Sequence, residues 1–155
     1  MKKRIYIASF FVFIIDLLSK FVISKTLVPL KEYFIIPKFF YICSVNNTGG
    51  AWSIMSGYTI IFILIAIGVL YYIFKYIIKD DMSILEELSF ILLIGGIVGN
   101  LFDRIIYGYV IDFIGFIIFG YRFPIFNIAD ICICIGAILL IIDLFRGGRN
   151  EVRSK

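Results

Sequence analysis

Four long apolar stretches constrain the fold of this 155-residue chain more than any other feature of its sequence. Each has about the 20 residues that an α-helix needs to cross the hydrocarbon core of a bilayer. They lie at 5–27, 57–78, 86–106 and 127–145. With 62% hydrophobic residues and a mean hydropathy of +1.05, the chain has the composition of an integral membrane protein. We therefore expect a single domain, residues 1–155, built on a bundle of four transmembrane helices.

Basic residues around these stretches predict the orientation of the bundle, because cytoplasmic loops are enriched in Lys and Arg. They form three groups, before the first stretch, between the second and third, and after the fourth: Lys2, Lys3 and Arg4; Lys75 and Lys79; Arg146, Arg149, Arg153 and Lys155. With an even number of spans, all three groups lie on one side. We expect both termini in the cytoplasm and the segments 28–56 and 107–126 outside.

The outer segment 28–56 is not an ordinary loop. Its part Y-F-I-I-P-K-F-F-Y-I-C-S-V, at 33–45, is rich in aromatic and β-branched residues and predicts short strands. N-N-T-G-G then turns the chain. Such a sheet is too apolar to be solvated on both faces, so it must rest on the membrane surface or the bundle. The predicted fold class is a membrane all-α bundle of four transmembrane helices with a small outer β-sheet segment.

Two acidic residues, Asp112 in V-I-D-F-I and Asp130 in F-N-I-A-D, lie in apolar surroundings near the outer ends of the spans. A carboxylate at membrane depth costs roughly 2.5–3.5 kcal/mol on insertion scales. Apolar neighbours should raise the pKa of Asp112, whereas Asn127 as N-cap and the helix terminus favour a charged Asp130. Two such acids predict a pair that shares a proton around a water molecule. The alternatives are a strand residue that points to water and an ordinary first-turn acid.

Further polar residues lie at the outer ends of the first and third spans. Asp103 and Arg104 are adjacent, which is typical of a structural ion pair; alternatively, Arg104 fixes an active-site loop or a substrate carbonyl. Asn100 lies one turn earlier and can face the same cavity. Asp16 and Lys20, four residues apart on one helix, can neutralise each other, with Lys20 extending outward to the interface. Packing and orientation are the simpler roles for this pair.

Other features narrow the functional classes. The three cysteines have no C-x-x-C spacing and the chain has no histidine, so we expect no zinc or redox site. We attribute the net charge of +4 to the basic residues that set the orientation in the membrane, so we expect no nucleic-acid partner. Gly95 and Gly99 have the G-x-x-x-G spacing of closely packed helices. A small proton-coupled transporter and a non-catalytic helix-packing assembly protein are the rival hypotheses. The transporter is disfavoured because the acids cluster at one face instead of forming a path.

Five motifs along the chain resemble, in order, those of the lipoprotein signal peptidase (signal peptidase II) family of bacterial membrane aspartyl proteases. They are I-D-L-L-S-K at 15–20, N-T-G-G-A-W-S at 47–53, G-N-L-F-D-R at 99–104, V-I-D-F at 110–113 and F-N-I-A-D at 126–130. The resemblance covers nearly the whole chain. Two departures are Gly50 and Trp52, which stand where Ala and Phe are common in the family.

The resemblance implies the residues of the site. Asp112 and Asp130 become the catalytic dyad of an aspartic endopeptidase. The residues that bind substrate or support the dyad become Asn47, Gly49, Asn100, Asp103, Arg104 and Asn127, with Asp16 and Lys20 behind them.

The resemblance also implies the reaction and its setting. The substrate would be a diacylglyceryl-modified prolipoprotein, cut just before its lipidated cysteine. The enzyme would act without metal or cofactor, as a monomer among the lipids of the bacterial cell membrane, with its active site near the outer face.

Overall fold

The structure is a computed structural model that describes residues 2–50, 54–79 and 81–153, with side chains as far as Arg146; the predicted motif residue Trp52 lies outside the described residues. The elements in chain order are α1 (Lys2–Thr26), β1 (Tyr33–Ile36), β2 (Phe40–Asn47), α2 (Thr59–Tyr72), the π-helix η2 (Ile73–Ile77), α3 (Ile84–Tyr107), β3 (Val110–Ile118), β4 (Tyr121–Arg122) and α4 (Ile128–Arg153).

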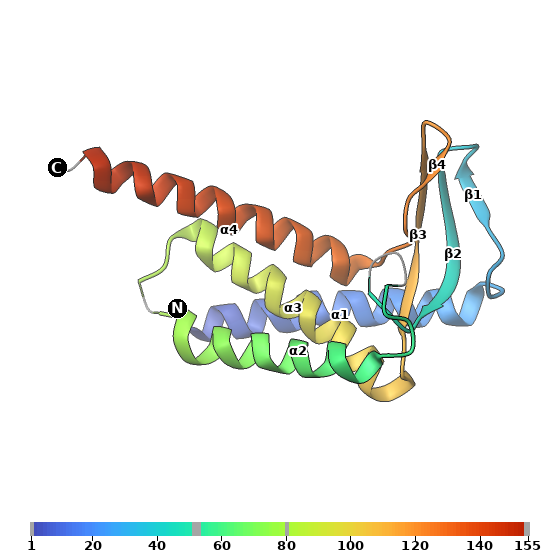
Figure 1. Ribbon diagram of the computed structural model, residues 1–155, viewed down its shortest axis with the longest axis horizontal. Helices are drawn as coiled ribbons and strands as arrows, with labels where there is room; N and C mark the ends of the chain where they lie inside the picture. The colour runs from blue at the N-terminus through green and yellow to red at the C-terminus, as the bar shows by residue number, and fades with distance from the viewer. Residues whose placement is uncertain (1, 51–53, 80, 154–155) are drawn as a thin grey trace.

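Among the described residues, four helical segments are long and apolar enough to cross a membrane: Lys2–Thr26, Thr59–Ile77, Ile84–Tyr107 and Ile128–Arg146. They lie within a few residues of the four predicted stretches. The helices run side by side, and α3 packs against each of the other three (Figure 1). Large apolar side chains cover the outside of the bundle, as a lipid environment requires. The prediction of a four-helix membrane bundle is confirmed.

Glycines on α3 let the helices approach closely. A Cβ added at Gly95 would lie 2.5 Å from the Cβ of Val12 on α1. One added at Gly96 would lie 2.5 Å from the carbonyl oxygen of Ala129 on α4. A larger residue at Gly95 would push α1 away, and one at Gly96 would push α4 away. The close helix packing predicted from the glycines of the third span is confirmed.

A four-stranded antiparallel sheet of order β1-β2-β3-β4 lies across one end of the bundle (Figure 1). The first two strands are those predicted in segment 28–56. The other two come from the second outer segment, 107–126, where a strand was considered only as an alternative setting for Asp112. In the ladder between β2 and β3, Val45 is the partner of Asp112. The fold thereby places one of the two candidate acids on the sheet, next to the helix ends.

The two ends of the bundle are filled differently. Far from the sheet, an apolar cluster joins α1, α2, η2 and α3: Ile5, Leu70, Ile73, Ile78, Phe90 and Ile94. At the sheet end, apolar residues of β2 and β3 such as Tyr41 and Phe113 are buried together with a group of polar side chains: Asp16, Lys20, Asn100, Asp103, Asp112 and Asn127. Because buried polar groups need partners, this second end requires a complete hydrogen-bond network.

Candidate active site

Asp112 projects from β3 toward the helix ends and is 3% exposed. Its Oδ2 accepts a hydrogen bond from Nδ2 of Asn47 at 2.9 Å, and its Oδ1 accepts one from Nδ2 of Asn127 at 2.6 Å. Burial, followed by the nearby charge of Asp130, raises the pKa of Asp112 to about 7. Asp112 is therefore a strand residue, as one alternative held, but it points into the protein and not to water.

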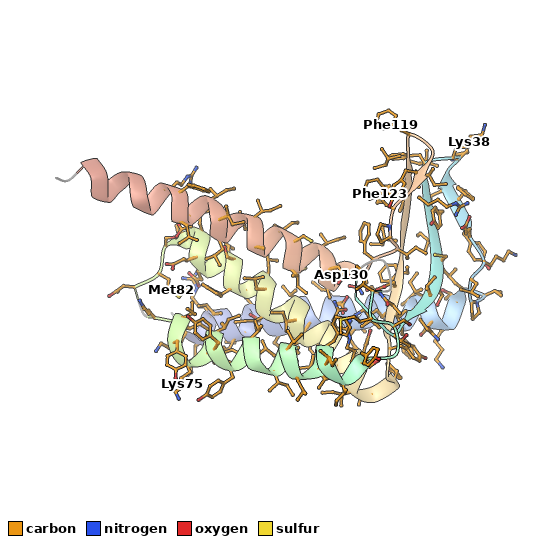
Figure 2. The ribbon with its side chains drawn as sticks, in the orientation of Figure 1. Lys38, Lys75, Met82, Phe119, Phe123 and Asp130 are labelled. Atoms are coloured by element: carbon orange, nitrogen blue, oxygen red, sulfur yellow. The ribbon has the colours of Figure 1, made fainter. Side chains whose placement is uncertain are left out.

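Asp130 lies in the first turn of α4, at the end of the helix beside the sheet (Figure 2). Its backbone N–H donates to Oδ1 of Asn127 at 2.9 Å, and its Oδ2 accepts from the backbone N–H of Asn127 at 3.2 Å. This reciprocal pair is a capping box, so the predicted N-cap is confirmed. Oδ1 of Asp130 also accepts from Nδ2 of Asn100 at 2.7 Å. The first-turn acid is thus held in one orientation from both sides.

Asn127 joins the two acids. It is fully buried, and its Nδ2 donates both to Asp112 and to Oδ1 of Asn100, the latter at 3.1 Å. The backbone N–H of Asp130 is a donor and needs an oxygen acceptor, so the amide oxygen Oδ1 of Asn127, and not its Nδ2, faces that N–H. The amide orientation is therefore fixed by its partners. Asp112 and Asp130 are brought together through this one side chain.

Arg104 and Asn47 hold the turn that follows β2. Asn47 accepts from the N–H of Gly49 at 2.9 Å and donates to the carbonyl oxygen of Gly50 at 3.2 Å. Nη2 of Arg104 donates to the carbonyl oxygen of Gly49 at 2.8 Å, and its guanidinium lies over the ring of Phe62, 5.0 Å from the centroid. The alternative in which Arg104 fixes a loop of the site matches these contacts.

The predicted ion pair between Asp103 and Arg104 is wrong. Consecutive residues on a helix point in different directions, and Asp103 turns toward α1, where Lys20 binds it at 3.0 Å. Lys20 also binds Asp16 at 2.7 Å and Oδ1 of Asn100 at 3.0 Å. The pairing of Asp16 with Lys20 is confirmed, but Lys20 is 1% exposed and does not extend to the interface.

A cavity of about 530 Å³ opens in front of the two acids. Its polar wall is formed by Asn47, Asn100, Arg104, Asp112 and Asp130. Its apolar wall consists of the segment 123–126 before α4 and of residues on the first two turns of α4: Phe123, Pro124, Ile125, Phe126, Ile131, Ile133, Cys134 and Ile135. All residues predicted for the site therefore lie in one connected cluster, with the dyad candidates at its open side.

Sequence reasoning missed the apolar wall and Phe62. The signal for the wall was the run F-P-I-F at 123–126, directly before Asn127. Cys134 follows Asp130 by four residues, which places both on one face of α4. No comparable signal links Phe62 to Arg104. Within residues 2–50, 54–79 and 81–153, the structure contains no group of three or more His, Cys, Asp or Glu residues arranged to hold a metal ion.

Comparison with known proteins shows the family to which the chain belongs. The family described as signal peptidase (SPase) II matches residues 8–146 of the chain. Lipoprotein signal peptidases from Staphylococcus aureus strains JH9 and Newman are both 42% identical over 142 residues, which cover 91% of this chain and 87% of each relative.

Two solved structures of bacterial membrane enzymes share the fold. One, obtained by the in meso method at 2.3 Å resolution, has a TM-score of 0.87 at 39% identity and covers 96% of this chain and 92% of its own. The other, at 1.9 Å resolution, has a TM-score of 0.81 at 40% identity and covers 92% of each chain. The chain therefore belongs to the signal peptidase II family, the aspartic proteases of bacterial membranes that cleave signal peptides from prolipoproteins.

Proposed function

We propose that Asp112 and Asp130 are the catalytic dyad of an endopeptidase that removes signal peptides from diacylglyceryl-modified prolipoproteins, cutting just before the lipidated cysteine. One observation carries the proposal. Two carboxyl groups from different elements, a strand and a helix, line one cavity and are joined by a buried asparagine. Such a pair can act as acid and base on one water molecule.

The surroundings of the two acids support a different catalytic role for each. Asp112 is the more enclosed, and a pKa of about 7 lets it keep a proton at neutral pH. Asp130 lies in the first turn of α4, where the helix dipole favours negative charge. In this assignment Asp130 is the general base and Asp112 the general acid.

The reaction then proceeds in two steps. A water molecule attacks the scissile carbonyl carbon while Asp130 takes a proton from the water and Asp112 gives its proton to the carbonyl oxygen. The resulting gem-diol collapses as the carbon–nitrogen bond breaks. In this second step Asp112 recovers a proton from one hydroxyl, and Asp130 gives its proton to the leaving amine. The dyad returns to its starting state with one proton.

The supporting residues keep this geometry fixed before substrate arrives. Asn47 and Asn127 each donate to one oxygen of Asp112, so its carboxyl plane cannot rotate freely. Arg104 holds Gly49 in the adjoining turn. Its buried Nε has no hydrogen-bond partner among the described residues.

The apolar wall of the cavity is the proposed place for the substrate's hydrophobic parts. Phe123 to Phe126 and isoleucines of α4 line the cavity, and the next isoleucines along α4, Ile135 and Ile138, are exposed on the outside of the helix. A substrate anchored by its own lipid can enter from the bilayer there. Since the lipid is already in an apolar medium, its main contribution is to position the scissile bond, which can be worth several kcal/mol of barrier.

We infer the arrangement in the membrane from charge. Both termini lie in the cytoplasm, and the sheet and the dyad lie near the outer face, because the groups of basic residues flank the opposite ends of the helices. The entire chain forms one peptidase domain, since α1, β2, α3, β3 and α4 all contribute side chains to the cluster. The same fact supports a monomer, because every member of the cluster comes from one chain.

The decisive experiment incubates purified enzyme with lipidated and unlipidated forms of one precursor, each with and without a chelator. We expect rapid cleavage of the lipidated form alone, unchanged by the chelator. Equal rates for the two forms would contradict the lipid requirement. Loss of activity with chelator, restored by a divalent ion, would contradict the aspartic mechanism.

Orientation is tested separately in intact cells. Phe119 is fully exposed at the tip of the sheet (Figure 2), so Phe119→Cys should react with a membrane-impermeant thiol reagent added outside. Lys79→Cys, between the second and third spans, should be protected. Both variants are made in a Cys134→Ser background, because Cys134 is itself exposed. The reverse labelling pattern would invert the proposed topology.

A further inference from the structure

Lys20 is a buried charged residue of α1 with three close partners. Its ammonium group lies 2.7 to 3.0 Å from Oδ2 of Asp16, Oδ2 of Asp103 and Oδ1 of Asn100. The contacts with Asp16 and Asp103 are ion pairs, and the contact with Asn100 is a hydrogen bond that Lys20 donates. Charge neutralisation alone would need only one of these partners.

Each of the three acceptors has a second contact, and each second contact leads to the dyad. Oδ1 of Asp16 accepts from the backbone N–H of Ala129 at 2.9 Å, one residue before Asp130. Gly99 makes room for this carboxylate, because a Cβ there would lie 2.4 Å from Oδ2 of Asp16. The chain that carries Asp130 is therefore tied to α1.

The strand that carries Asp112 is tied to the same point. Oδ2 of Asp103 accepts from the backbone N–H of Ile111 at 3.2 Å, one residue before Asp112. The third acceptor, Asn100, donates directly to Oδ1 of Asp130 at 2.7 Å. One ammonium group thus links the backbones on both sides of the reacting pair.

We propose that Lys20 is a positioning residue that sets the separation of the two dyad aspartates. It holds Asp16 and Asp103 where their second contacts fix the chain just before each acid. This inference rests on the proposed function, because it takes Asp112 and Asp130 to be the reacting groups. Displacement of catalytic groups by about 1 Å can lower a rate about 10²-fold, so the arrangement should act on kcat and not on substrate binding.

Two isosteric variants separate positioning from charge. Asp16 uses one oxygen for Lys20 and the other for Ala129, so the single acceptor oxygen of Asp16→Asn cannot keep both contacts. Asp103 uses the same oxygen for Lys20 and for Ile111, so Asp103→Asn can keep both. Each variant removes one negative charge from the same cluster. We expect kcat to fall about 10²-fold in Asp16→Asn and less than about tenfold in Asp103→Asn, with KM within about twofold in both.

Equal losses of kcat in the two variants, or a rise in KM alone, would overturn the inference. If Asp16→Asn does not fold, the double variant Lys20→Met/Asp103→Asn removes the ammonium group while the cluster keeps its net charge. A kcat within about twofold of wild type in this folded double variant would also overturn it, because misplacement should cost about 10²-fold.

Two controls accompany these measurements. Lys25→Met, the same substitution at an exposed position of α1, should leave kcat unchanged; an equal loss of kcat there would overturn the assignment to Lys20. Asp112→Asn in the same assay distinguishes the two proposals. If it retains activity, the proposed dyad is wrong; if it is inactive while the Lys20 and Asp16 variants keep full kcat, only the positioning role is wrong.

Discussion

The two ends of the helix bundle are stabilised by different forces. The end far from the sheet contains the apolar core of aliphatic side chains and one phenylalanine, whose packing depends on volume and shape. The sheet end contains the connected network of carboxylates, amides and an ammonium group, whose contacts depend on direction and on pairing. Within a bilayer, no bulk water is available to replace a lost partner.

This difference separates stability from catalysis along the length of the molecule. Apolar cores tolerate swaps that conserve volume at a cost usually below about 1.5 kcal/mol. A buried polar network tolerates few changes, since each group left unpaired costs about 1–3 kcal/mol. The same strictness gives the sheet end the fixed geometry that acid–base chemistry needs. Changes at the two ends should therefore affect different measured quantities.

The largest effect is expected at the dyad. Asp112→Asn and Asp130→Asn should each lower kcat by roughly 10⁴-fold, the upper end of what acid–base groups contribute, because an amide cannot exchange a proton with water or a leaving amine. Cleavage of a lipidated precursor is measured beside circular dichroism and gel filtration in detergent. A folded variant that kept a tenth of wild-type turnover would exclude that residue from the dyad.

A methyl group at the sheet end should have the next largest effect. In Gly99→Ala the new Cβ collides with the carboxylate of Asp16, so kcat should fall by about 10²-fold and the melting temperature should drop as well. The matched control is Gly68→Ala on α2, where a Cβ meets nothing within 4 Å. This control should have wild-type activity and equal or slightly higher stability, because Gly in a helix costs roughly 0.5–1 kcal/mol relative to Ala. Equal activity in the two variants would contradict the tight packing around Asp16.

The pH dependence should give a smaller but specific signal. Asp112 must hold its proton, so kcat/KM should fall about tenfold per pH unit above about 7. An unfolded Asp ionises near about 3.9. Between about pH 4 and about 7 the folded state therefore binds a proton that the unfolded state does not, and the free energy of unfolding decreases as pH rises through this window. The melting temperature of Asp112→Asn should lack that decrease; an unchanged slope would argue against the raised pKa.

The smallest effect on turnover is expected at the apolar end, where stability should change most. Phe90→Ala should lower the free energy of unfolding by about 3–5 kcal/mol through the cavity it creates, whereas kcat below the melting temperature should stay within about twofold. Thermal unfolding and initial rates are measured on the same preparation. A large loss of kcat in folded Phe90→Ala would show that the two ends are coupled.

The sequence was most predictive where a pattern depends on few contacts. The four spans and the first strands follow from local apolar runs, and the N-cap at Asn127 follows from its spacing to Asp130. Asp103 was assigned the wrong partner because adjacency in sequence is not proximity of side chains on a helix. The strand at Val110–Ile118 was predicted only as an alternative for Asp112, because its pairing depends on β2, more than 60 residues earlier.

The pairing of β2 with β3 has a consequence for how the enzyme is made. The strands that form the ladder are separated by α2 and α3, so the first hairpin must wait until two more spans have been inserted. Asp112 then reaches the sheet, but Asp130 arrives only with α4, which follows β4 in the chain. We expect proteolytic competence to appear only when α4 enters the bilayer. A ribosome-tethered chain that ends between β4 and α4 should carry the ladder yet cleave no precursor, so the growing chain has no active protease before α4 has been made.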